Sequence, residues 1–266
     1  MSAVIGAVGA VIGVGVTGFT SQLRQMRATP DWLLALFTTP LMTVAFVALV
    51  DHADRRDLTA YAVLAPALIA LWQMALQTAG ELVTTERENG SLEALLATPG
   101  SFAALLAGRI AAVTAVSLLA FVEAWGVGWA MTGSPLAVAH PVVFAATVLV
   151  SAAAMTATAG IMASVFVLAR SARIFQNALS YPFYVLGGVV LPVALLPEPF
   201  AWLSRLVFLS WTSDLLRDAV APAPVDAVVP RLLVIAALGA AAAGLSHHLL
   251  VRTVDRLRVT GRLSHA

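Results

Sequence analysis

Long apolar stretches recur along the chain, separated by short polar or proline-containing connections. A helix that crosses the hydrocarbon core of a bilayer needs about 20 mostly apolar residues. Six stretches meet this requirement, and we predict spanning helices over 32–50, 61–80, 103–131, 142–169, 174–196 and 231–251. The pattern therefore predicts an all-α membrane protein with a six-helix transmembrane domain over 31–251.

The region between the fifth and sixth predicted spans, 197–230, has a different pattern. Aromatic residues and leucines alternate with charges over 200–220. This mixture is typical of the membrane–water interface. We predict one or two helices at, or dipping into, the outer leaflet, which makes 197–230 an outer re-entrant region.

The first 19 residues carry no charge and contain five glycines. Their length would allow a seventh span, but glycine disfavours an isolated helix. We therefore expect an interfacial or loosely ordered segment, followed by a short amphipathic helix over 20–28. Residues 1–30 together form the predicted cytoplasmic or interfacial N-terminal segment.

Composition agrees with a membrane protein. Apolar residues make up 60% of the chain and charged residues 11%, and the mean hydropathy is +0.92. Soluble domains are about 45–50% apolar and about 25% charged. The net charge of +1 gives no sign of nucleic-acid binding.

All 15 basic residues are arginines, and their distribution predicts the orientation. Short cytoplasmic flanks are enriched in basic residues. With the N-terminus inside, ten arginines lie on the inner side: Arg24, Arg27, Arg87, Arg109, Arg170, Arg173, Arg252, Arg256, Arg258 and Arg262. Both termini are therefore predicted to be cytoplasmic, with 252–266 as a basic tail.

The inner connection after the second span is strongly acidic. It contains Glu81, Glu86, Glu88 and Glu93 against one arginine, Arg87. Asn89-Gly90 predicts a turn and Ser91 can cap a new helix. A helix lying on headgroups is usually basic, and anionic lipid would repel this one. The alternative, docking to a basic partner protein, is favoured.

Residue types absent from the chain exclude several activities. Without cysteine there is no thiolate chemistry, and without lysine there is neither a Schiff base nor a standard Walker A loop. We also find no HExxH, no GxSxG and no paired intramembrane aspartate. His247 and His248 are adjacent, so they do not form an i, i+4 metal pair. We predict no enzyme activity, no metal site and no cofactor on this chain.

Glu123 is the one carboxylate well inside a predicted span. Ionisable residues in membranes are costly and often functional. Glu123, with Trp125 nearby, is a candidate for the substrate path. The alternative is that the span ends early and Glu123 lies at the interface. A proton-coupled carrier that uses Glu123 is the second functional hypothesis.

One stretch resembles the RExGTLExLLxTP motif of type-2 ABC transporter permeases. It reads Glu86-Arg87-Glu88-Asn89-Gly90-Ser91-Leu92-Glu93, followed by Leu95-Leu96 and Thr98-Pro99, with Ser91 in place of the usual threonine. Residues 22–27 are similar to the connecting helix of that family, and the resemblance covers roughly 20–260. Where the family often has Asn-Pro in the re-entrant region, this chain has Ser210-Trp211.

The resemblance implies a pore formed by two permease subunits, identical or different, and two cytoplasmic ABC ATPase subunits that bind ATP and Mg²⁺. It implies a multi-pass protein of the plasma or inner membrane that exports a drug, antibiotic, lipid or polysaccharide by alternating access. It assigns a coupling helix, 86–97, to contact with the ATPase, through Glu86, Arg87, Glu88, Gly90, Ser91, Leu92, Glu93, Leu96 and Pro99.

Three further residues are candidates for transmitting motion from the ATPase to the spans: Glu81, Arg24 and Arg27. Glu81 lies at the inner end of the second span, where a solvated acid at a helix end is the equally weighted alternative. Arg24 and Arg27 belong to the segment that resembles the connecting helix.

Overall fold

The computed structural model describes residues 2–28, 32–88, 102–133, 136–168 and 172–260, and this part of the chain contains helices and no strands. The principal helices are α1 (Ser2–Ala28), α2 (Trp32–His52), α3 (Thr59–Glu88), α5 (Phe102–Ser117), α6 (Leu119–Thr132), α7 (Pro141–Leu168), α8 (Ala172–Leu186), α9 (Glu198–Ser204), α10 (Phe208–Val220) and α11 (Val228–Thr260). Short 3₁₀ turns, η1 (Arg56–Leu58) and η2 (Val193–Leu195), lie in connections.

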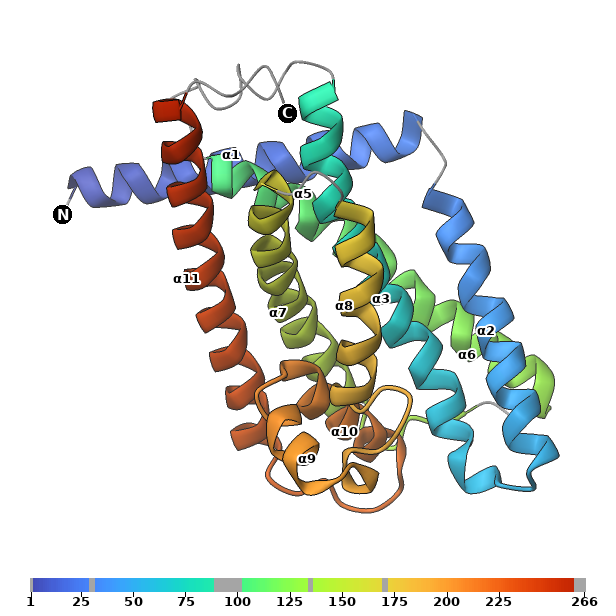
Figure 1. Cartoon of the computed structure of the whole chain (residues 1–266). Helices are drawn as coiled ribbons and strands as arrows, with labels where there is room; N and C mark the ends of the chain where they lie inside the picture. The colour runs from blue at the N-terminus through green and yellow to red at the C-terminus, as the bar shows by residue number, and fades with distance from the viewer. Residues whose placement is uncertain (1, 29–31, 89–101, 134–135, 169–171, 261–266) are drawn as a thin grey trace.

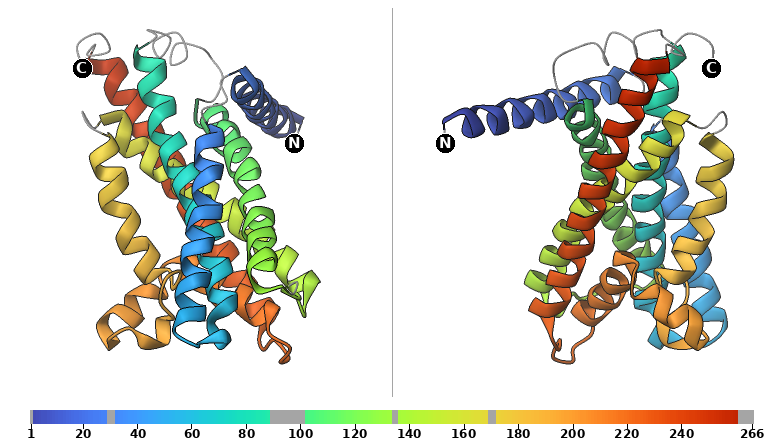
Figure 2. Two further views of the ribbon diagram at one scale, coloured as in Figure 1. Left: turned by 90° about the vertical axis from the view of Figure 1, so that its right-hand side faces the viewer. Right: turned by 60° about the vertical axis from the view of Figure 1, so that its left-hand side comes forward.

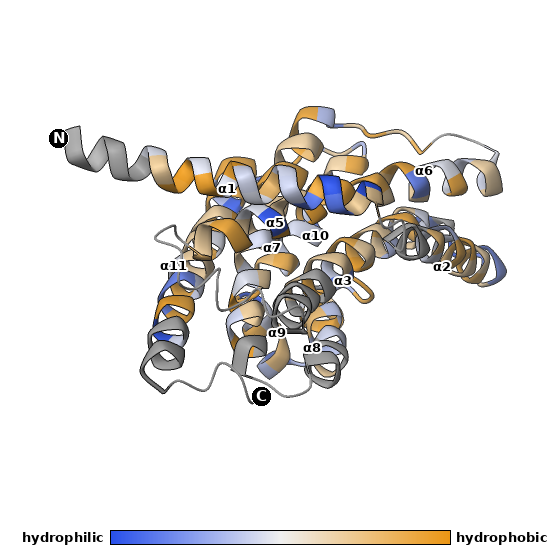
Figure 3. Ribbon diagram, turned by 90° about the horizontal axis from the view of Figure 1, so that it is seen from above, coloured by the Kyte–Doolittle hydropathy of each residue, from blue (hydrophilic) through white to orange (hydrophobic). Residues whose placement is uncertain are grey.

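The long helices run side by side and give the bundle two distinct ends (Figure 1). One end carries α9 and α10 and is called the hairpin end. The other carries α1, the last turn of α3 and the last turn of α11, and is called the termini end. Large apolar side chains are exposed on the flanks, among them Phe37, Leu41, Val122 and Leu233. In the view from the termini end, much of the described ribbon has the colour of hydrophobic residues (Figure 3). Such a surface suits lipid rather than water.

Four stretches of the described residues are long and apolar enough to cross a membrane: Thr59–Leu76, Phe102–Thr132, Pro141–Val165 and Val228–Thr253. They correspond to the second, third, fourth and sixth predicted spans. In α2, the apolar stretch Phe37–His52 is too short to meet this criterion. The described residues thus contain four candidate membrane spans, while the count of six remains a prediction.

The third predicted span, 103–131, is interrupted at Leu118. On one side of the break α5 packs against α1, α3 and α7, and on the other side α6 packs against α2 and α3. The hydropathy pattern gives no sign of this break, because both halves are uniformly apolar.

The prediction that the fifth span runs to residue 196 is wrong, because α8 ends at Leu186. Gly187 and Gly188 turn the chain there, and Gly188 has a φ of +62°, which favours glycine. A Cβ on Gly187 would lie 2.8 Å from Cδ2 of Leu209. The turn therefore needs glycine at both positions, and the apolar residues after it belong to the hairpin connection.

The N-terminal segment is one continuous helix, α1, which lies across the termini end of the bundle (Figure 2). The loosely ordered alternative for the first 19 residues is therefore wrong, and α1 does not run parallel to the spans. Glycine is unfavourable in an isolated helix, but here Gly18 of α1 and Gly108 of α5 let the two helix backbones approach closely. Tertiary contact offsets the low propensity.

The predicted re-entrant region folds as two helices. The shorter, α9, exposes Phe200 and Trp202. The longer, α10, is packed against α7, α11, α3 and α8, and buries Leu215 and Leu216 completely. We refer to residues 198–220 as the outer hairpin.

The core is organised around α3, which contacts α2, α5, α6, α7, α8 and α10. In its segment Thr59–Leu76, 78% of the residues are buried, compared with 11% of an 18-residue apolar stretch within Val228–Thr253 of α11. Trp72 of α3 stacks on Phe183 of α8, with ring centroids 4.3 Å apart.

Helices α7 and α11 approach closely at two points. At Gly239 of α11, a Cβ would lie 2.9 Å from that of Ala154. At Gly160 of α7, a Cβ would overlap Oγ of Ser246. Small residues at such points let helix backbones approach within a membrane.

Candidate functional site

The predicted coupling segment starts on the last turn of α3. This helix ends at Glu88, at the termini end, and also carries Glu81, Glu86 and Arg87. The rest of the predicted contact surface lies outside the described residues: Gly90, Ser91, Leu92, Glu93, Leu96 and Pro99. The segment therefore begins on the helix with the most buried core of the bundle, while its own conformation and its role stay predictions.

A close backbone contact joins α1 to α5. A Cβ on Gly108 would overlap the carbonyl oxygen of Gly15, and a Cβ on Gly18 would overlap that of Leu105. Next to this contact, Arg109 donates from Nε to Oε1 of Gln22 (3.0 Å). It also donates from Nη2 to Oε1 of Gln25, at 2.7 Å. The segment similar to a connecting helix is thus fixed to the third predicted span.

The transmission candidates lie near these contacts in different ways. Arg24 and Arg27 are exposed on α1, beside the glutamines that Arg109 binds. Glu81 lies on α3, two turns before its end. The structure brings the three to the termini end of the bundle, and their role in transmission stays a prediction.

Glu123 lies on α6, which packs against α2 and α3. Its Oε2 atom is buried and has no hydrogen-bond partner among the described residues. The indole of Trp125 already has partners within the protein. Its Nε1 donates to the carbonyl of Leu136 (3.0 Å), and its ring packs edge-on against Phe144. Of the two, Glu123 alone has an unused polar group for a ligand; the substrate path itself remains a prediction.

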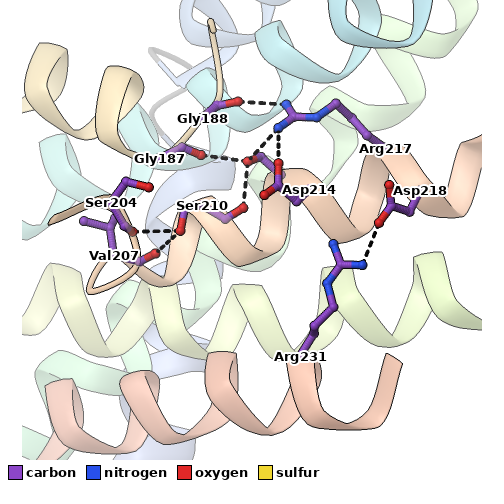
Figure 4. A network of polar contacts seen from close by, with 10 residues as sticks. Gly187, Gly188, Ser204, Val207, Ser210, Asp214, Arg217, Asp218 and Arg231 are labelled. Atoms are coloured by element: carbon purple, nitrogen blue, oxygen red, sulfur yellow. Dashed lines mark hydrogen bonds and ion pairs between the residues drawn. The ribbon is translucent and has the colours of Figure 1, made fainter. Parts of the chain in front are cut away.

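Ser210 and Trp211 close the outer hairpin. Oγ of Ser210 donates to the carbonyl of Ser204 (2.7 Å) and to that of Val207 (2.9 Å). Nε1 of Trp211 donates to the carbonyl of Arg205 (2.9 Å). These bonds tie the first turn of α10 to the connection from α9, and Figure 4 shows the two bonds of Ser210.

Further along α10, Arg217 is only 8% exposed and binds the turn that follows α8. Its Nη1 donates to the carbonyl of Gly188 (2.7 Å), and Nη2 donates to Asp214 (2.5 Å). Oγ of Ser213 donates to the carbonyl of Gly187 (2.7 Å). The same guanidinium lies over the ring of Tyr61 on α3, 4.3 Å from its centroid. Figure 4 shows this convergence of α10 and the turn after α8.

The far end of α10 is fixed to α11 and to the start of α7. Arg231 of α11 pairs with Asp218 (2.6 Å). The backbone N–H of His140 donates to the carbonyl of Ala219, and its ring lies 2.9 Å from the carbonyl of Ala223. Polar contacts therefore hold α10 along its whole length.

No cluster of three metal-ligating side chains occurs in the described part of the chain. The prediction that ATP and Mg²⁺ bind a partner subunit, rather than this chain, is untested.

The sequence predictions missed the role of Arg217. They placed it with the other charges of an interfacial helix, whereas it is buried. One signal was present: Asp214 precedes Arg217 by about one helical turn, a spacing that allows the two side chains to pair. The carbonyls of the α8 turn and the ring of Tyr61, which complete its surroundings, come from segments distant in sequence.

Comparison with known proteins places the chain in a family. The family model "ABC-2 type transporter" matches residues 15–220. A search of curated proteins finds no relative that matches. The matched range includes α1 from Gly15 onwards, the acidic segment after α3 and the whole of α10. The chain belongs to the ABC-2 type transporter family, as a membrane-embedded permease component.

Proposed function

We propose that this chain is the permease subunit of an ATP-driven exporter that moves an amphipathic or hydrophobic substrate out of the cytoplasm by alternating access. Drugs, antibiotics, lipids and polysaccharides are the candidate substrates. Two cytoplasmic ABC ATPase subunits hydrolyse ATP, and a second permease subunit completes the pore. The protein resides in the plasma or inner membrane.

The observation that carries this proposal is the acidic segment 86–97, with its RExGTLE-like motif, at the end of α3. A motor subunit that presses on this segment acts directly on a helix whose core is surrounded by six others. The absence of lysine from the chain supports a separate motor, because a Walker A loop needs one.

The orientation is part of the proposal. The termini end is assigned to the cytoplasm, because ten of the 15 arginines flank that side. On the hairpin end Arg55, Arg217 and Arg231 each form an ion pair with a nearby aspartate. The bond from Arg55 lowers the pKa of the Asp57 carboxyl, so this exposed pair keeps its opposite charges over a wide pH range.

Reconstitution with an ABC ATPase tests the proposal. The ATPase encoded nearest to this chain should co-purify with it, and its ATP hydrolysis should rise in the presence of the permease. Screening ligands for further stimulation would then identify the substrate class. The proposal would be contradicted if the ATPase did not associate with the permease, or if its rate of ATP hydrolysis were the same with and without the permease.

Replacing Glu123 with glutamine is expected to change substrate transport. The variant keeps the shape of the side chain and removes the carboxylate, whose Oε2 has no partner in the described structure. A neutral amide is cheaper than a charge within a membrane, so stability should not fall. Transport and its pH dependence are measured beside the thermal unfolding midpoint; unchanged transport at all pH values would remove Glu123 from the substrate path.

A further inference from the structure

The feature that the proposed function leaves unused is the buried arginine of α10. Burying a charged side chain is expensive unless it is paired and hydrogen-bonded. Arg217 is 8% exposed and satisfies this condition with Asp214, the carbonyl of Gly188 and the face of Tyr61. Such a set of partners specifies one position for the side chain.

These partners belong to three different elements. Asp214 lies on α10 itself, Gly188 lies in the turn that ends α8, and Tyr61 lies in the first turn of α3. Glycine suits position 188 because φ is +62° and because a Cβ there would lie 2.8 Å from Cγ2 of Val193 and 3.0 Å from Oγ of Ser213. The outer hairpin is thus joined to two bundle helices at one point.

The contact with α3 links the hairpin to the opposite end of the molecule. Tyr61 and Glu88 lie 27 positions apart on the continuous helix α3, or about 40 Å at 1.5 Å per residue. Pro66 interrupts its hydrogen bonding close to Tyr61, but residues 67–72 and 74–76, which follow it, are buried. Close-packed interiors transmit displacement rather than absorb it.

We propose that the contact between Arg217 and Tyr61 couples α3 to the outer hairpin, so that a displacement of α3 at the coupling segment moves α10. Arg217 is a positioning residue in this scheme and does not touch substrate. The inference rests on the proposed function, because the ATPase supplies the displacement. It adds the route by which that displacement reaches the far side of the bundle.

Tyr61 gives a matched pair of variants. Tyr61→Phe keeps an aromatic face for the guanidinium, and Tyr61→Leu removes it while remaining apolar. A desolvated cation–π contact is substantial, so we expect about tenfold faster amide hydrogen exchange over residues 205–220 in Tyr61→Leu, with Tyr61→Phe close to the parent. Exchange over 141–165 should stay unchanged and controls for general unfolding.

This first measurement uses the permease alone and does not depend on an ATPase. Equal exchange at 205–220 in the two Tyr61 variants would show that the contact does not hold the hairpin, and would overturn the inference. Arg217→Lys and Arg217→Met supply a second pair: lysine keeps the charge but loses the planar fork of donors. We expect amide exchange over 205–220 in Arg217→Lys to lie between that of the parent and that of Arg217→Met.

The second measurement uses the permease with its ATPase. ATP should change exchange at 205–220 in the parent and in Tyr61→Phe, whereas in Tyr61→Leu the change should be lost there although ATP hydrolysis continues. If ATP changes exchange at 205–220 in Tyr61→Leu as much as in the parent, the proposed coupling is overturned. A parent complex that shows no response to ATP anywhere contradicts the proposed function instead, and the permease-alone measurement still reports on the contact.

Discussion

Reversing the charges of Glu86 and Glu88 to arginine is expected to abolish stimulation of the partner ATPase and, with it, transport. The acidic segment is proposed to dock on a basic groove, and two reversals turn attraction into repulsion. Close charge pairs at protein interfaces contribute about 1.5–7 kcal/mol in double-mutant cycles. Loss of two such pairs predicts at least about a hundredfold weaker association. Both residues lie on the last turn of α3, so the bundle itself should remain folded.

The matched control reverses two acidic residues at the opposite end of the bundle. Asp51 and Glu198 are both exposed, and changing them to arginine adds the same charge far from the coupling segment. ATP hydrolysis with and without each permease, together with co-purification, is the measurement. Equal stimulation by the Glu86/Glu88 variant and by this control would contradict a docking role for the acidic segment.

Replacing Gly108 with alanine is expected to displace α1 from α5. The added methyl group would overlap the carbonyl oxygen of Gly15, and a backbone atom cannot move aside by rotating a side chain. Overpacking of this kind costs about 1–3 kcal/mol. The displacement would also separate Arg109 from Gln22 and Gln25. We expect a lower unfolding midpoint and faster proteolysis within 2–28.

Two other glycines, on α1 and α6, serve as controls. Nothing lies within 4 Å of the Cβ position of Gly13 on α1 or of Gly126 on α6. Alanine at either site should leave stability unchanged, or raise it slightly through better helix propensity. If Gly108→Ala behaves like these two variants, close backbone contact is not what holds α1 in place.

Hydropathy predicted the long helices well and their ends less well. The limits of α2 and α7 agree with the predicted spans within two residues. An apolar stretch long enough to span the bilayer and bounded by polar residues has few possible structures other than a helix. The end of α8 was predicted ten residues too late. Val189, Val190 and Leu191 continue the apolar run, and a hydropathy window cannot detect a chain that turns back at Gly187 and Gly188.

Contacts between distant segments account for the remaining errors. The helical state of α1 depends on the backbone of α5, which propensity for an isolated helix does not include. Arg217 looked interfacial because its neighbours in sequence are charged, whereas Tyr61 and Gly188 are far away along the chain. The motif at 86–97 was recognised from residue types alone, because its residues are contiguous in sequence.

The two close contacts between α7 and α11 restrict how these helices can participate in transport. On α11 the contacts are Gly239 and Ser246, seven residues or about 10 Å apart. Two separated points fix the crossing angle as well as the axial position. A slide of one helical turn would bring the much larger Ile235, rather than Gly239, against Ala154. The pair should therefore turn and tilt as one rigid unit.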